Sequence, residues 1–196
     1  MEKLKVDSML EYKFLSDLKY SPDGENLAFK VSNADQDEND YNSNLWIYNI
    51  KEDSFYQLTS GKKDGGFTWL NPEEIIFTSK RKNKDDEKIL PETEFYKISI
   101  NGGEALHLKT IERAVGDFKV KDQGQIIFTA MKDLKERNEE ELKEDKDYQI
   151  LEEIPFWSNG KGFTDSYRNH LYSLDYETGE VKELVGGKNN LGNFVL

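Results

Sequence analysis

An internal repeat is the feature that most limits what this chain of 196 residues can fold into. Three segments align, each with a short apolar strand, a tight turn and a second strand that ends in phenylalanine: Asp17–Phe29, Gly66–Phe77 and Asp117–Phe128. In the first copy the turn contains Pro22, which presets the backbone, and Gly24, which can take a conformation that a Cβ would forbid. We therefore expect Phe29, Phe77 and Phe128 to hold equivalent positions in three repeated units, each facing a neighbouring unit.

A second pair of strands follows each of these segments. The third strands carry alternating large residues and are expected at Leu45–Ile50, Phe95–Ile100 and Leu171–Tyr176. The fourth strands are expected at Tyr56–Thr59, Ala105–Lys109 and Val181–Val185. Four antiparallel strands that meander through tight turns make the blade of a β-propeller. The sequence therefore predicts an all-β fold, an incomplete β-propeller of about three four-stranded antiparallel blades plus the first strand of a fourth.

The repeat also predicts where the blades lie. They are expected at about residues 14–60, 65–110 and 115–187, and the third contains an insertion at 132–166. Residues 192–196 match the start of the third unit, so we expect them to begin a fourth blade. This pattern suggests a truncated gene or an expressed fragment. The alternative is a complete three-unit sheet protein with an extended tail, although three blades are too few for a closed ring.

Three polar stretches interrupt the strand pattern. Residues 33–44 and 81–92 connect the second and third strands of their blades, and we expect solvated, mobile loops there. Residues 132–147 contain good helix formers, but Leu134 and Leu142 are their only apolar anchors. A short surface helix and a disordered loop are both consistent with this segment.

Composition limits the classes of partner. With 27 Lys and Arg against 39 Asp and Glu, the net charge is −12, which disfavours nucleic acid and anionic membrane surfaces. The chain has no apolar run long enough to cross a bilayer, and its first residues do not read as a signal peptide. It has no cysteine, so it offers no disulfide or thiolate metal site. We expect a cytoplasmic protein without a metal or cofactor.

At this level of detail the chain resembles a known family. The residues that carry the resemblance are Ser21-Pro22-Asp23-Gly24, Leu27-Ala28-Phe29, Leu45-Trp46, Gln57-Leu58-Thr59, Asn101-Gly102-Gly103 and Arg168-Asn169-His170-Leu171-Tyr172. In this order they resemble the N-terminal β-propeller of serine peptidases of the prolyl oligopeptidase family, nearest the acylaminoacyl-peptidase branch. The similarity covers almost the whole chain. The Ser-Pro-Asp-Gly turn also occurs in TolB-like propellers, which are non-enzymatic.

The resemblance implies a function for the full-length protein. In this family the propeller caps a C-terminal α/β-hydrolase domain with a Ser-Asp-His triad, admits peptide substrates and excludes folded proteins. The Gly-x-Ser-x-Gly elbow that presents such a nucleophile is absent from this sequence. The two histidines, His107 and His170, lie in predicted strands, where surface or packing roles are usual. We expect the chain to be inert, a gating and substrate-selecting domain of an acylaminoacyl- or dipeptidyl-peptidase-like enzyme. The alternatives are a TolB-like protein-binding module and a degenerate gene fragment.

Two groups of residues are candidates for a site in that enzyme. Aromatic side chains crowd a glycine-rich turn in 154–167, and the candidate substrate contacts there are Phe156, Trp157, Phe163, Tyr167 and Arg168. This segment either completes the third blade as a strand and turn or lines the cavity between the two domains. Dipeptidyl-peptidase relatives hold the substrate amine with a glutamate pair, for which the candidates are Glu139, Glu140, Glu152 and Glu153. A solvated acidic face is the simpler interpretation of these glutamates.

The repeat finally predicts an interaction of the chain with itself. A blade in a closed propeller packs on both faces, so the first and third blades should each expose an apolar sheet face. We expect self-association through these faces, limited to small oligomers by the net charge of −12.

Overall fold

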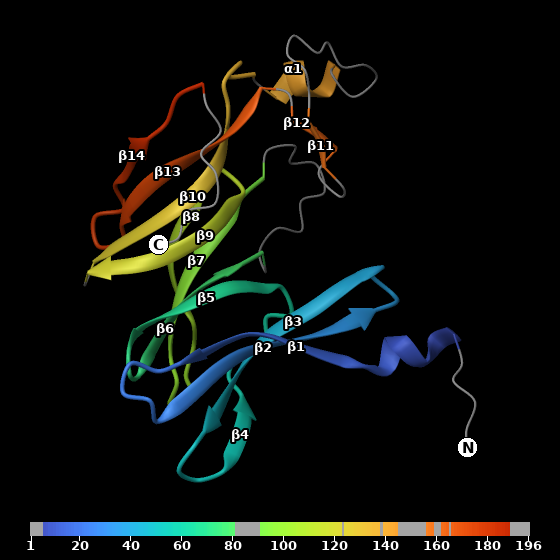
Figure 1. Ribbon diagram of the computed structural model, residues 1–196, viewed down its shortest axis with the longest axis vertical. Coiled ribbons are helices and arrows are strands. Elements are labelled where there is room, and N and C mark those ends of the chain that lie inside the picture. Colours follow the sequence, from blue (N-terminus) through green and yellow to red (C-terminus); the bar gives the residue numbers. More distant parts are fainter. Residues whose placement is uncertain are drawn as a thin grey trace. The chain divides into compact units, whose positions relative to one another are not determined.

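The structure is a computed structural model that describes residues 6–80, 91–122, 124–137, 139–144, 156–158, 162–164 and 166–188. Within these ranges the chain consists almost entirely of strands (Figure 1). The short 3-10 helix η1 (Val6–Glu11) precedes the first strand, and α1 (Glu139–Glu144) is the one α-helix of the described residues. The predicted all-β fold class is confirmed.

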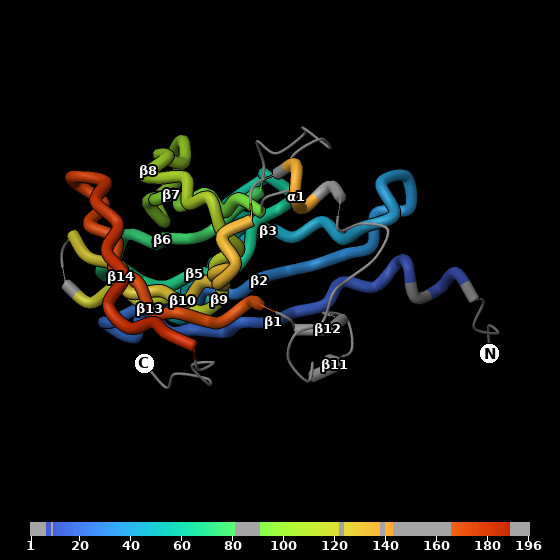
Figure 2. Tube along the Cα trace, turned by 90° about the horizontal axis from the view of Figure 1, so that it is seen from above, coloured from blue at the N-terminus to red at the C-terminus, as the bar shows by residue number. Residues whose placement is uncertain are grey.

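Twelve of the strands form three four-stranded antiparallel sheets, which we call blades 1, 2 and 3. Blade 1 contains β1 (Lys13–Tyr20), β2 (Asn26–Asp35), β3 (Asp40–Asn49) and β4 (Ser54–Gln57). Blade 2 contains β5 (Asp64–Asn71), β6 (Glu74–Ser79), β7 (Thr93–Ser99) and β8 (Leu106–Ile111). Blade 3 contains β9 (Val115–Asp122), β10 (Gln125–Asp133), β13 (Tyr167–Asp175) and β14 (Val181–Val185). Each blade is a meander, and β1 and β2 lie side by side in both views (Figures 1 and 2). Three blades are fewer than the four to eight of a closed ring, so the fold is an incomplete propeller.

The chain divides into two compact units. The first unit holds blades 1 and 2, and the second unit holds blade 3. The second also contains the hairpin of β11 (Phe156–Ser158) and β12 (Gly162–Thr164), which, within the described ranges, pair with each other and with no other strand.

Strand register confirms the predicted equivalence of the three phenylalanines. In every blade the phenylalanine of the second strand pairs with an aromatic residue of the third: Phe29 with Trp46, Phe77 with Tyr96 and Phe128 with Tyr172. In blades 2 and 3 these rings stack, with centroids 5.6 and 5.4 Å apart. The three blades therefore share both the order of their strands and the pairing of a phenylalanine with an aromatic residue.

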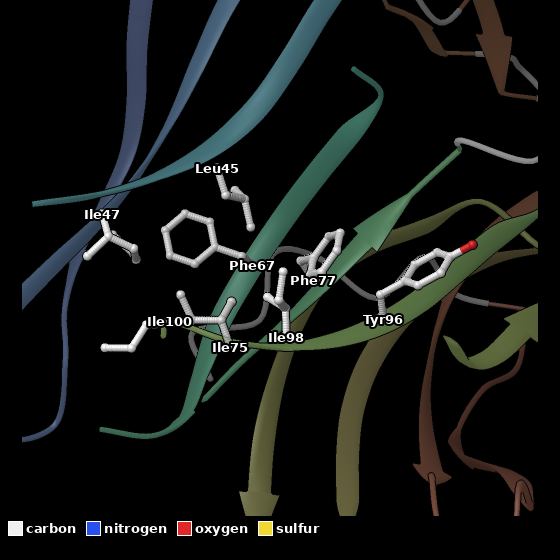
Figure 3. Close-up of a cluster of buried hydrophobic side chains, with 9 residues drawn as sticks. Leu45, Ile47, Phe67, Ile75, Phe77, Tyr96, Ile98 and Ile100 are labelled. Atoms are coloured by element: carbon white, nitrogen blue, oxygen red, sulfur yellow. The ribbon is translucent and has the colours of Figure 1, made fainter. Parts of the chain in front are cut away.

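Blades 1 and 2 enclose an apolar core in the first unit. Leu45 and Ile47 of β3 project toward Phe67 and Ile75 of blade 2 (Figure 3), and all four are buried. Lys19 of β1 donates a hydrogen bond to the carbonyl oxygen of Phe67. Blade 1 thus packs on blade 2 through one face of its sheet.

Each blade also has a β-bulge at the same place in its first strand. The register shifts between Ser16 and Lys19 in blade 1, and between Asp64 and Phe67 in blade 2. In blade 3 the shift lies opposite Phe128–Ala130. A Cβ on Gly65 would lie 2.6 Å from Thr78 Oγ1, and one on Gly116 would lie 2.8 Å from Thr129 Oγ1. A side chain at Gly65 or Gly116 would therefore force the facing threonine of the second strand to shift.

The prediction of a mobile loop at residues 33–44 is wrong. Strand β2 continues to Asp35 and β3 begins at Asp40, so most of this segment is a paired hairpin. The Asn42 amide donates to the Asp35 carboxylate across the hairpin at 2.7 Å. Polar residues can extend a hairpin once the buried part has set its register. Because such an extension has no alternating apolar residues, the sequence pattern does not predict it.

Two other expectations concern the third blade. Of the polar segment 132–147, Glu139–Glu144 is helical, as one of the two interpretations predicted. The interpretation of 154–167 as a strand and turn of blade 3 is wrong, because β11 and β12 form a separate hairpin and β13 supplies the third strand. The segment 192–196, predicted to begin a fourth blade, lies outside the described residues, as does 81–90.

Candidate functional site

The insertion of blade 3 leaves the sheet at a cluster of polar side chains, which we call the insertion base. Asp133 ends β10 and pairs with Tyr167 at the start of β13. The Arg137 Nε donates to Asp133 Oδ2 at 2.7 Å, and its Nη2 donates to Ser166 Oγ at 2.8 Å. The Ser166 hydroxyl in turn donates to Asp133 Oδ1. The three side chains close the neck of the insertion as a ring of charge-assisted hydrogen bonds.

The ring keeps Asp133 ionised. Burial raises the pKa of Asp133, but the hydrogen bonds from Arg137 and Ser166 outweigh it, so that pKa lies below its ordinary value. The backbone N–H of Lys135 adds a further hydrogen bond to the carboxylate, at 3.1 Å. Because the carboxylate stays charged, it serves as an anchor rather than as a proton donor.

Tyr167 and Arg168, two of the predicted substrate contacts, lie at this base. The Arg137 guanidinium lies over the Tyr167 ring, 5.6 Å from its centroid. Arg168 Nε donates to the Lys188 carbonyl at 2.8 Å, and its Nη1 donates to the Tyr167 carbonyl at 3.0 Å. These contacts bind the two residues to the backbone around the insertion.

For most of the remaining candidates, the described part of the chain includes the backbone at most. Phe156 and Trp157 lie on β11 and Phe163 on β12, but their side chains fall outside the described residues. Of the candidate amine-binding residues, Glu140 is exposed on α1. The side chain of Glu139 and both Glu152 and Glu153 fall outside the described residues.

His107 belongs to a second polar group, on blade 2. The buried Glu94 accepts a hydrogen bond from the Tyr96 hydroxyl at 2.8 Å. His107 Nε2 lies 3.9 Å from Glu94 Oε1 and 3.0 Å from Thr110 Oγ1. The His107 ring meets the Tyr96 ring edge-on, with centroids 5.3 Å apart. The group joins the third and fourth strands of the blade.

His170 belongs to a matching group on blade 3. Its ring is 1% exposed, and its Nδ1 lies 3.3 Å from Glu183 Oε1 without a hydrogen bond of good geometry among the described residues. Burial raises the pKa of Glu183, but Lys132 and His170 outweigh it and hold that pKa below its ordinary value. A Cβ on Gly186 would lie 2.7 Å from Nδ1 of the buried His170 ring, so a side chain there would force this pair to shift.

The two histidine groups occupy equivalent positions of the repeat, with the histidine and the glutamate exchanged between strands. Glu94 and His170 each precede the aromatic residue of the third strand by two positions, and each partner follows 13 residues later in the fourth strand. In blade 2 the acid is on the third strand and the histidine on the fourth, while in blade 3 the order is reversed. Blade 1 has Asn44 and Gln57 at these positions. Sequence reasoning missed the pairs, although the common spacing of 13 residues was a signal that could have found them.

Both groups connect the third and fourth strands of a blade. Neither histidine is paired with a serine nucleophile among the contacts found in the described residues. No group of three or more His, Cys, Asp or Glu in the described part of the chain could hold a metal ion. No described helix is long and apolar enough to cross a membrane.

Comparison with known proteins shows that this chain is similar to parts of longer peptidases. No protein-family model matches it. An uncharacterized peptidase of Bacillus subtilis, YuxL, is 27% identical over 96% of this chain. The chain spans only 28% of the length of that relative.

Solved structures agree with the fold. Acylaminoacyl peptidase of Pyrococcus horikoshii superposes with a TM-score of 0.70 at 14% identity, over 91% of this chain and 26% of that one. The β-propeller domain of the Trilobed protease from Pyrococcus furiosus gives 0.52 at 14%, over 90% and 44%. A TolB-type protein of Agrobacterium tumefaciens gives 0.50 at 13%, over 84% and 46%. The chain therefore has the fold of consecutive β-propeller blades, which it shares with the Trilobed protease propeller and with part of acylaminoacyl peptidase.

Proposed function

We propose that this chain is part of the propeller domain of a serine peptidase. In the full-length protein, the propeller selects peptide substrates for a C-terminal α/β-hydrolase domain. The observation that carries the proposal is the 27% identity to peptidase YuxL along 96% of the chain. The similarity in fold to acylaminoacyl peptidase supports it.

The insertion base belongs to this proposal. The hydrogen bonds of Arg137 and Arg168 fix the ends of the insertion, whose aromatic residues would face the substrate. In this arrangement Tyr167 and Arg168 position the insertion, and Phe156, Trp157 and Phe163 contact the peptide.

Two preparations test the proposal together: this chain alone and the complete product of its gene. Both are incubated with a fluorophosphonate probe and with acylated and unblocked chromogenic peptides. We expect no labelling of the chain, because its described histidines contact carboxylates and not a serine. The complete protein should be labelled at one serine and should cleave short peptides but not a folded protein. Stoichiometric labelling of this chain would contradict the proposal.

A TolB-like protein-binding module is the second candidate, favoured by the similarity to the Agrobacterium protein. The complete gene product separates the two. If it contains further blades but no Gly-x-Ser-x-Gly elbow and takes up no probe, the binding module is supported.

A further inference from the structure

A surface turn of blade 2 places an asparagine directly before a glycine. Strand β7 ends at Ser99, and Ile100, Asn101 and Gly102 lead from it toward β8. The Gly102 N–H donates to the Ser99 carbonyl oxygen at 3.1 Å and closes the turn. Asn101 is exposed, so water reaches its side-chain amide. The other asparagine–glycine pair of the chain, at 159–160, lies outside the described residues.

A glycine after an asparagine permits a reaction of the asparagine side chain with the backbone. The Gly102 nitrogen attacks Cγ of Asn101, a C–N bond forms, and the side-chain nitrogen leaves as ammonia with the proton that the attacking nitrogen gives up. The product is a cyclic imide, a succinimide. Water then adds to one of the two imide carbonyl groups and breaks its C–N bond, which leaves aspartate or isoaspartate at position 101. The reaction consumes water and needs no oxidant or reductant.

The backbone at Gly102 leaves this attack open. Its φ is +93°, and a Cβ built on it would meet nothing within 4 Å. The attacking nitrogen is therefore not shielded by a side chain, and glycine can rotate through conformations that other residues rarely adopt. Attack requires the hydrogen bond from the Gly102 N–H to Ser99 to open. That bond lies in an exposed turn, where local opening costs least free energy.

The corresponding turn of blade 1 holds its asparagine differently. Strand β3 ends at Asn49, and the next residue is Ile50, whose branched Cβ shields the backbone nitrogen. The Asn49 Oδ1 accepts a hydrogen bond from the Glu52 N–H at 2.9 Å, and its Nδ2 donates to Asn26 Oδ1 at 3.2 Å. Asn49 is therefore a suitable reference for an asparagine of the same sheet architecture that reacts slowly.

The turn of blade 2 is also tied to blade 1. The Tyr56 hydroxyl donates to the Ile100 carbonyl oxygen at 2.6 Å. The Ile100 N–H donates to the Glu73 carbonyl oxygen at 2.8 Å, and its side chain lies in the apolar core of the first unit (Figure 3). A change in the backbone at position 101 therefore acts directly beside a residue that joins the two blades.

From this turn we propose that Asn101 is a site of spontaneous deamidation through a succinimide. Both products replace a neutral amide with a carboxylate, and isoaspartate also carries the main chain through one more carbon atom. Because that extra length follows Ile100, it weakens the hydrogen bond from Tyr56, and blade 1 is held less firmly on blade 2. The conversion marks the age of the molecule and lowers the stability of its first unit.

Peptide mass spectrometry of the folded chain, sampled during incubation at mildly alkaline pH, tests the assignment. The peptide that contains residue 101 should gain the mass change of one deamidation, and a methyltransferase specific for isoaspartate should label it. Conversion at Asn101 should be roughly tenfold or more faster than at Asn49. Equal rates at these two residues, or an unchanged residue 101, overturn the proposal.

Thermal melts test the consequence for stability. Asn101→Gln keeps a neutral amide but closes such a ring far less readily, and it retains the pair at 159–160, so it is the matched control. After equal incubation, the melting midpoint of the original chain should lie roughly 3–8 °C below that of Asn101→Gln. Equal midpoints of the two aged proteins contradict the predicted loss.

A further variant tests the route through the blade contact. Tyr56→Phe removes the hydroxyl that bonds Ile100, so ageing should lower the midpoint less in this background than in the original chain. An equal drop with and without the hydroxyl overturns this route. Circular dichroism confirms folding. If Tyr56→Phe does not fold, hydrogen exchange at Ile100 replaces it, and this amide should exchange faster in the aged chain. Unchanged exchange there also overturns the route.

Discussion

Asp133 is the residue whose charge is most closely tied to local structure, because Arg137 and Ser166 both bond its carboxylate. A carboxyl group with a lowered pKa in the folded state binds its proton more readily when the chain is unfolded. Its contribution to stability is therefore present above the unfolded pKa and is lost as the pH falls through the folded value.

We expect Arg137→Ala to make the second unit less stable at neutral pH and less sensitive to acid. The original chain should lose stability between about pH 5 and pH 3, and the variant should lose less over that interval. Urea titrations at a series of pH values measure this. Lys182→Ala, which removes an exposed cation from the same unit, is the matched control. Parallel pH profiles for all three proteins would contradict the prediction.

At the scale of elements, the reversed histidine–glutamate pairs show that one position of the repeat accepts either order. Glu94 and His107 join β7 to β8, and His170 and Glu183 join β13 to β14. In both blades the pair lies beside an aromatic ring of the third strand, Tyr96 or Tyr172.

This equivalence can be tested by exchange. Glu94→His alone and His107→Glu alone should each destabilise the first unit, because each places like groups together beside Tyr96. The double variant restores one acid and one histidine in the order found in blade 3, and should recover most of the loss. Denaturation midpoints of the four proteins give the coupling energy. Additive losses in the double variant would show that the two blades are not equivalent here.

The sequence predicted those elements whose apolar residues alternate. The last strand was expected at Val181–Val185 and lies there, and the three phenylalanines hold equivalent places. The hairpin that pairs Asp35 with Asp40 was missed because its residues are polar and its register is inherited from Phe29 and Trp46. The insertion base was missed for another reason. Asp133 and Ser166 are 33 residues apart, and only the pairing of β10 with β13 brings them together.

At the scale of the molecule, the stability of the first unit rests on the core between blades 1 and 2. Phe77 lies within it, fully buried and stacked on Tyr96. Truncation of a buried phenylalanine removes its transfer free energy and leaves a cavity.

We expect Phe77→Ala to destabilise the first unit by about 3–5 kcal/mol, a large part of the roughly 5–15 kcal/mol that ordinarily holds a domain folded. Phe55→Ala is the matched control, because Phe55 is 66% exposed and its loss should change stability by no more than about 0.5 kcal/mol. Thermal melts followed by circular dichroism compare the two variants. Similar midpoints for both would place Phe77 outside the core.

The contact of Lys19 with Phe67 and Trp69 has a consequence for how such a chain can change over generations. Both of its hydrogen bonds end on main-chain carbonyl oxygens, which every residue supplies. A substitution at Phe67 therefore leaves the acceptor of the Lys19 bond in place. The donor side chains of Lys19 and Trp69 are the ones that inheritance must preserve for these two bonds to persist.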